Sequence, residues 1–146
     1  MQIIKQQKRL VLPQKVALIG NFETFNFSIP QTHFIDFFQA RKIETSFAKG
    51  YEEEDDIDES LLNEAQRKAQ AADVAFVLLY APEGANKIPI TQHQLIRSVS
   101  LVQSNLLALV YARAEIKTAW KKYTYSSLQI DEEIEITEIM EEIFTL

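Results

Sequence analysis

The sequence predicts an α/β protein: a three-layer α/β/α sandwich with a doubly wound, mostly parallel sheet of about five strands, flavodoxin-like or Rossmann-like. Short, continuous apolar runs recur along the chain, and such runs are typical of strands buried on both faces. Amphipathic helical patterns separate these runs, and alternating strands and helices imply crossover connections in a parallel sheet. With 146 residues, 47% hydrophobic and 25% charged, the chain has the size and composition of one globular domain, residues 1–146.

The first strand and helix are predicted over residues 15–40. Lys15 to Gly20 is a short apolar run closed by glycine, as in a buried strand. After a polar, Phe-rich loop, Pro30 opens a helical pattern whose broad apolar face carries Phe34, Ile35, Phe37 and Phe38. Ile43 to Ala48 alternates loosely and predicts a second strand.

An acidic run follows the second strand. Residues 52–59 hold seven acids in eight positions. A calcium loop of the EF-hand type requires oxygen ligands at alternate positions and a central glycine, whereas these acids are consecutive and contain no glycine. We therefore expect a solvated loop, whose last acids favour the N-terminus of the next helix.

The rest of the chain continues the alternation of helices and strands. We predict a helix from Asp58 to Ala72, a strand over Asp73–Tyr80, a helix from Thr91, a strand over Asn105–Ala112, a short helix over Glu115–Trp120, an edge strand over Tyr123–Leu128 and an amphipathic helix over Glu132–Leu146. The most apolar runs, at residues 15–20, 73–80 and 105–112, are expected in the interior of the sheet.

Net charge and apolar patterning exclude several classes of protein. The chain carries 15 Lys and Arg against 21 Asp and Glu, and this net charge of -6 argues against a nucleic-acid-binding surface. No uncharged apolar stretch is long enough for a membrane span, and the N-terminus has no signal-peptide pattern. We therefore expect a cytoplasmic protein. The start at Met1 and the final helix favour a natural short protein over a fragment.

Motifs for cofactors, metals and nucleophiles are absent from the sequence. It has no GxGxxG, no GxxxxGK[ST] and no GxSxG, and nothing positive supports a flavin site. Cysteine is absent, and His33 and His93 lack the spacing of metal ligands. The prediction is no cofactor and no metal.

In a doubly wound sheet, sites form where strands end near the switch in winding direction, which here predicts the loops over residues 20–27, 81–87 and 112–115. Glu83 lies on a Pro/Gly turn after the most apolar strand. A carboxyl group there acts as a general acid if it is partly buried, and is an ordinary turn residue if it is fully solvated.

Several segments, in this order, resemble the C-terminal α/β domain of family 3 glycoside hydrolases, the β-glucosidase family. They are Ile3–Lys5 with Leu10–Pro13 and Lys15–Gly20; Phe47–Tyr51; Glu64–Ala69 with Ala71–Val77; Pro82–Gly84; and Ile88–Ile96, which follows the family pattern LPxxQxxLI. The chain departs from the family after Gly84, where Asn86-Lys87 leads directly to Ile88-Pro89 without the family's Asp-Arg pair.

The resemblance implies a role in glycoside hydrolysis. Such enzymes pair this domain with a (β/α)8 barrel that carries the nucleophile, and the α/β domain commonly supplies a glutamate as acid/base; Glu83 is the matching position. We expect Asn21, Phe22, Asn86 and Arg113, in the three predicted loops, to contact a carbohydrate ligand. Because 146 residues are too few to include a barrel, we expect little activity from the chain alone.

The partner implied is a separate barrel subunit or a second copy of the chain. Five aromatic residues either contact a partner or a sugar, or fill the core. Three of them, Phe22, Phe25 and Phe27, lie beside the first loop, and the other two are Tyr80 and Trp120.

The alternative to a role in glycoside hydrolysis is a stand-alone flavodoxin-like ligand-binding or interaction module. A phosphoryl receiver is disfavoured because no aspartate follows the first or third strand directly, and a dimerisation unit would use the last helix.

Overall fold

The computed structural model describes residues 2–5, 9–20, 31–51, 58–80, 88–111, 126–129 and 136–146. The elements in chain order are β1 Gln2–Lys5, β2 Leu10–Val11, β3 Lys15–Ile19, α1 Gln31–Ala40, β4 Glu44–Ala48, α2 Glu59–Gln70, β5 Val74–Tyr80, α3 Ile90–Ser100, β6 Leu106–Tyr111, β7 Ser126–Gln129, α4 Ile136–Ile143 and β8 Phe144–Thr145.

Six strands of the described residues form one sheet in the order β1-β7-β6-β5-β3-β4. Neighbouring strands are parallel except for β1, which runs antiparallel to β7. From β3 the chain first adds β4 on one side and then β5 and β6 on the other. The winding direction therefore reverses between β3 and β5, and the predicted doubly wound, mostly parallel sheet is confirmed.

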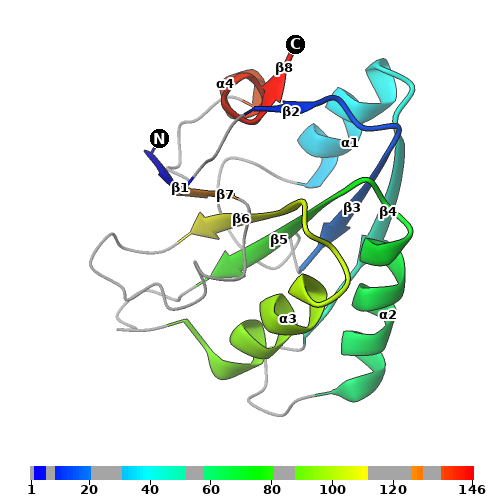
Figure 1. Cartoon of the computed structure of the whole chain (residues 1–146), viewed down its shortest axis with the longest axis vertical. Helices are drawn as coiled ribbons and strands as arrows, with labels where there is room; N and C mark the ends of the chain where they lie inside the picture. The colour runs from blue at the N-terminus through cyan, green and yellow to red at the C-terminus, as the bar shows by residue number, and fades with distance from the viewer. Residues whose placement is uncertain are drawn as a thin grey trace.

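Helices cover both faces of this sheet, with α1 and α4 on one face and α2 and α3 on the other (Figure 1). Side chains of each buried strand alternate between the two layers. In β3, Val16 and Leu18 join the cluster under α1 and α4, while Ala17 and Ile19 join the cluster under α2 and α3. The three apolar strands predicted for the interior, β3, β5 and β6, lie there.

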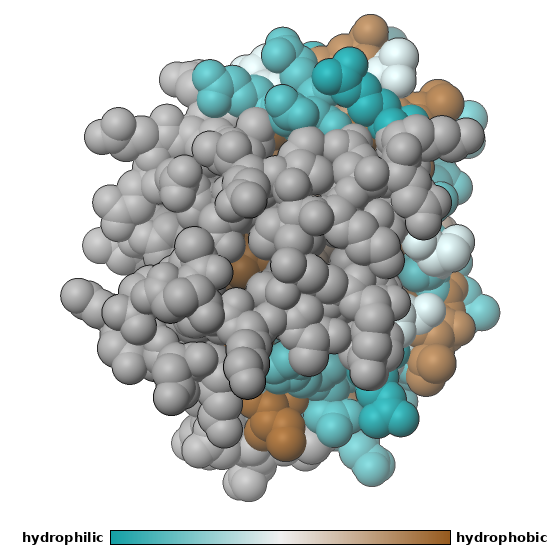
Figure 2. Space-filling view, turned by 60° about the vertical axis from the view of Figure 1, so that its left-hand side comes forward, coloured by the Kyte–Doolittle hydropathy of each residue, from teal (hydrophilic) through white to brown (hydrophobic). Residues whose placement is uncertain are grey.

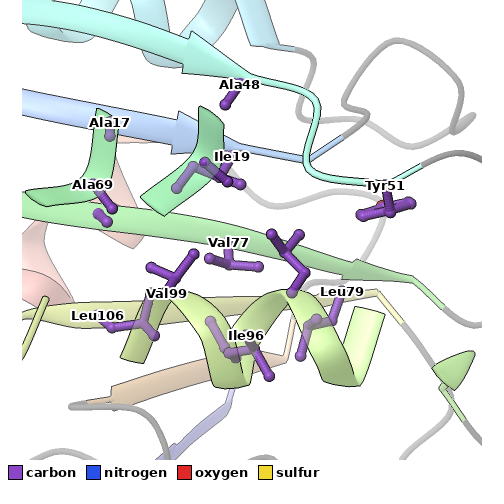
Figure 3. Packing of buried hydrophobic residues seen from close by; sticks show 14 of the residues in the cluster. Ala17, Ile19, Ala48, Tyr51, Ala69, Val77, Leu79, Ile96, Val99 and Leu106 are labelled. Carbon is purple, nitrogen blue, oxygen red and sulfur yellow. The ribbon is translucent and has the colours of Figure 1, made fainter. Parts of the chain in front are cut away.

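Aromatic rings fill the layer under α1 and α4. Phe34 and Phe38 of α1 pack on Phe76 of β5, with ring centroids 5.9 and 6.0 Å apart, and Phe144 lies 6.2 Å from Phe76 on another side. All four side chains are fully buried. The layer under α2 and α3 is built mostly from alanines and branched aliphatic residues, and it also includes Tyr51 (Figure 3).

Polar side chains fasten the amino ends of the strands, opposite the predicted site. The Asp73 carboxylate accepts from the backbone N–H groups of Gln14 and Lys15, at 2.9 and 3.1 Å, and so ties β3 to β5. The Gln103 amide donates to the carbonyls of Ala69 and Ala72 at the end of α2. The Gln103 side chain thus bonds to backbone carbonyls at and just beyond the C-terminus of α2, where helix carbonyls lack intrahelical partners.

Two predictions about the ends of the chain were wrong. The predicted edge strand at 123–128 corresponds to β7, which lies between β6 and β1 and is therefore an inner strand. The described residues hold six strands in the large sheet, close to the predicted number of about five, because β1, only four residues long, adds to β7. The last helix stops at Ile143, and the chain continues as β8, which pairs with β2.

The apolar face of α4 is used within the chain itself. Ile139, Met140 and Ile143 are buried in the cluster under α1 and α4. This packing removes the basis for a dimer contact through that face. The short helix predicted over residues 115–120 lies outside the described residues.

Candidate functional site at the carboxyl edge of the sheet

The ends of four parallel strands form one edge of the sheet. Ile19 of β3 lies level with Ala48 of β4 and Val77 of β5, and the last residue of β5, Tyr80, pairs with Tyr111 of β6. The arrows of β5 and β6 point to the left of Figure 1. Figure 2 turns that side forward, and described polar and apolar residues border it at the top, right and bottom.

All five predicted site residues lie outside the described residues, but the positions from which their segments depart are described. Asn21 and Phe22 directly follow Gly20 at the end of β3. Glu83 and Asn86 belong to the segment between Tyr80 and Ile88, and Arg113 is two residues beyond Tyr111. These segments therefore leave the sheet at one edge.

Two of these segments flank the switch in winding direction. The segment with Asn21 and Phe22 follows β3, and the segment with Glu83 and Asn86 follows β5. Since β3 and β5 are the neighbours between which the winding reverses, their loops border the crevice in which doubly wound proteins bind ligands.

Gly20 allows the two flanking strands to come close at this point. Its φ angle of +125° is a conformation that other residues rarely adopt, and a Cβ atom there would lie 2.9 Å from the Leu78 Cβ. The Gly20 N–H group donates to the Ala48 carbonyl at 2.9 Å. Gly20 thus lies against β5 while it remains bonded to β4, and the polar segment that follows begins from a fixed position.

Sequence reasoning did not include in the site the Gly50 turn, which we define as Ala48–Tyr51. It begins at the last residue of β4 and also leaves the carboxyl edge of the sheet. Ala48 and Tyr51 are buried in the cluster under α2 and α3, and Lys49 is exposed. Figure 3 shows Tyr51 past the end of the strand that carries Ile19. Gly50 has a φ of +81°. A glycine directly after a strand, within a family-like motif, was the signal that could have found this turn.

The segment Ile88–Ile96 owes its pattern to packing. Ile88, Leu95 and Ile96 are buried, and Gln92 is 4% exposed. Pro89 is the N-cap of α3, and no side chain caps that end of the helix. The described motif residues thus hold α3 against the sheet.

Asp58 occupies the N-cap of α2 at the same edge, as expected for the last acids of the acidic run. Its Oδ1 accepts from the Ser60 hydroxyl at 2.6 Å and from the backbone N–H groups of Ser60 and Leu61 at 2.9 and 3.4 Å. The hydroxyl bond first, and then the bond from the Ser60 N–H, lower the pKa of the Asp58 carboxyl below its ordinary value. Its charge is thereby fixed in place at neutral pH.

Metal ligands do not gather in the part of the chain that the structure describes: no three His, Cys, Asp or Glu residues come together there. His33 and His93 lie in the first turns of α1 and α3, near the helix starts as predicted. None of the helices within the described ranges has the length and apolar composition needed to cross a membrane.

Comparison with known proteins shows that the chain is similar to part of several β-glucosidases. The chain is 35% identical over 89 residues to thermostable β-glucosidase B of Acetivibrio thermocellus, an alignment that covers 54% of the chain and 12% of that enzyme. In structure it matches the GH3 β-glucosidase of Bifidobacterium adolescentis with a TM-score of 0.64 and 25% identity, over 79% of the chain. The chain resembles the C-terminal α/β domain of family 3 β-glucosidases. No protein-family model matches the chain.

A second β-glucosidase structure supports the fold alone. The chain matches β-glucosidase from Listeria innocua, in its complex with isofagomine, with a TM-score of 0.70 and 14% identity over 86% of its length. The chain spans about one fifth of the matched β-glucosidase structures: 20% of each of the two chains. The predicted resemblance to family 3 β-glucosidases is thus confirmed for a domain-sized part of these larger enzymes.

Proposed function

We propose that this β-glucosidase-like chain, as a single domain over residues 1–146, acts in the hydrolysis of β-glucosides together with a separate (β/α)8 barrel, and that Glu83 is the general acid/base. One observation carries the proposal. The segment that contains Glu83 leaves the central strand β5 at the switch in winding, in a chain with sequence and structural likeness to family 3 β-glucosidases.

Chain connectivity supports the assignment of Glu83. Glu83 is the third residue after Tyr80, the last residue of β5, so chain connectivity keeps the two Cα atoms within about 11 Å of each other. Asn21 and Phe22 start one residue beyond Gly20 on the neighbouring strand, and Arg113 starts two beyond Tyr111. We propose that these residues, with Asn86, contact the sugar beside Glu83.

The chemistry of the reaction explains why a barrel is required. A retaining glycosidase uses two carboxyl groups about 5 Å apart, one as nucleophile and one as acid/base. In this proposal the Glu83 carboxyl donates its proton to the glycosidic oxygen as the C–O bond breaks, while the carboxylate of the barrel bonds to the sugar carbon. The Glu83 carboxylate then takes a proton from the water that releases the sugar.

A complementation assay tests the proposed function. The purified chain is assayed with an aryl β-glucoside alone and with fractions of a lysate from its source cells, and the active fraction is tested for a complex that contains the chain. We expect hydrolysis only in the complex. Full activity of the chain alone would contradict the proposal. No activity in any fraction, from a chain shown to be folded by circular dichroism, would favour a stand-alone ligand-binding or interaction module instead.

Substitution of Glu83 by glutamine tests whether the Glu83 carboxyl takes part in the reaction. In the complex, Glu83→Gln should lower kcat about 100- to 10,000-fold, with a larger loss for a poor leaving group, because the amide cannot donate the proton. Glu59→Gln, an exposed glutamate in the first turn of α2, is the matched control and should keep full activity. A Glu83→Gln complex with undiminished kcat would remove Glu83 from the mechanism.

A further inference from the structure

We propose that Gly50 is a positioning residue: its close contact with Leu95 of α3 fixes the end of the segment that carries Glu83. The positioning follows from the contacts of the described residues, and its consequence for catalysis rests on the proposed function. The Gly50 turn lies about forty residues from α3 in sequence, but the two meet at the carboxyl edge of the sheet.

The contact leaves no room for a side chain at residue 50. A Cβ atom on Gly50 would lie 2.7 and 2.8 Å from the two terminal methyl groups of Leu95, and 3.1 Å from the Ile19 Cγ2. Carbon atoms in contact normally stay about 3.5–4.0 Å apart. The Leu95 side chain therefore packs directly on the backbone of the turn, and the position of α3 depends on that backbone.

The start of α3 packs against the cluster under α2 and α3. Its N-cap residue is Pro89, which makes no side-chain capping bond. Apolar packing holds this end instead, because Ile88, Leu95 and Ile96 are each at most 1% exposed. Farther along the helix, Gln66 of α2 donates to the Ser98 carbonyl at 2.8 Å.

The two ends of the Glu83 segment are consequently fixed by different parts of the structure. Its first end follows Tyr80, which the sheet holds through pairing with Tyr111. Its second end joins Ile88, which is buried in the same cluster as Tyr51 and Leu95. A displacement of α3 would move the second end while the first stays in place, and so would reorient the residues between them.

Hydrogen exchange on the chain alone tests the positioning. Gly50→Ala should raise amide exchange over residues 88–96 at least tenfold, while β6 and α4 keep their exchange rates. Adding Leu95→Val to Gly50→Ala withdraws the methyl groups that clash, and should restore at least part of the protection. The backbone strain at residue 50 is the same in both variants, so the difference between them reports the Leu95 contact.

Gly20→Ala is the matched control. It also places a Cβ atom at a glycine with positive φ on the same edge, but the contact that it would disturb is with Leu78 of β5. We expect no selective effect on residues 88–96 in this variant. Equal acceleration throughout the chain in Gly50→Ala, no acceleration at all, or no restoration by Leu95→Val would overturn the proposal.

Kinetics of the barrel complex test the catalytic consequence. Gly50→Ala should lower kcat about tenfold or more, with KM nearly unchanged and with a larger loss for poor leaving groups, and Leu95→Val should recover part of the loss. If the Glu83→Gln complex lost its activity while the Gly50→Ala complex kept its full kcat, the positioning role of Gly50 would be overturned and the proposed function would stand. An unaffected Glu83→Gln complex would overturn the proposed function, and the exchange result would still stand by itself.

Discussion

The contacts of Gln103 predict a measurable loss of stability when its amide is removed. Its Nε2 donates to the Ala69 and Ala72 carbonyls at 2.9 and 2.7 Å, and its Oε1 accepts from the Asn105 N–H group at 3.0 Å. One side chain thus joins the end of α2 to the residue that precedes β6. Gln103→Ala leaves two carbonyl groups and one N–H group without these partners.

The magnitude follows from the number of bonds and their exposure. A hydrogen bond within a protein contributes about 1 kcal/mol net, so three bonds amount to about 3 kcal/mol. Because Gln103 is only half-buried, water replaces part of what is lost, and we expect the free energy of unfolding to fall by about 2 kcal/mol. In a domain of this size, that change lowers Tm by about 4–8 °C.

Chemical unfolding followed by circular dichroism measures this effect directly. Gln70→Ala, which removes an exposed glutamine at the last residue of α2, is the control and should change the free energy of unfolding by less than about 0.5 kcal/mol. A Gln103→Ala variant within about 0.5 kcal/mol of the wild type would refute the reasoning, because it would show that water fully replaces the three bonds.

Two further predictions concern helix ends. Lys42 follows α1 with a φ of 58°, a left-handed conformation that glycine adopts more readily than lysine, and the Ile43 N–H group donates to the Phe38 carbonyl at 2.9 Å. Lys42→Gly should therefore raise the free energy of unfolding by about 0.5–1 kcal/mol. A lower urea midpoint in this variant would contradict the prediction. Asp58→Ala should lower Tm at pH 7. Because the folded-state pKa of Asp58 is depressed, its contribution is present above its ordinary pKa of 3.8 and is lost as the pH falls through the folded-state value. The difference in Tm should therefore close in strong acid, and a difference that stays constant with pH would contradict the assignment.

Sequence patterns predicted the centre of the fold because its signals are local and strong. The run Val74–Tyr80 is continuously apolar, and its seven-residue length favours a strand covered on both faces over a buried helix. The ends were harder to predict. β1, β2 and β8 have four, two and two residues, and strands this short are defined by their pairing partners instead of by periodicity.

The candidate site was predictable as an edge of the sheet but not as a set of contacts. Gly20 and Tyr80 end predicted strands, and the switch rule then indicates which loops matter. The meeting of Gly50 with Leu95 could not be inferred in this way, because a contact between distant segments depends on the tertiary packing of α3. The family-like motifs at residues 47–51 and 88–96 marked both partners without showing that they touch.

The central claim is that Glu83 is the acid/base of a retaining β-glucosidase formed with a barrel, and azide tests it most directly. Azide attacks the glycosyl–enzyme without needing a general base, so it bypasses the step that Glu83→Gln blocks. With an activated aryl β-glucoside, the account predicts that azide restores the rate of the Glu83→Gln complex and that NMR identifies the product as β-glucosyl azide. No restoration by azide, in a complex whose rate the substitution has lowered, would contradict the claim.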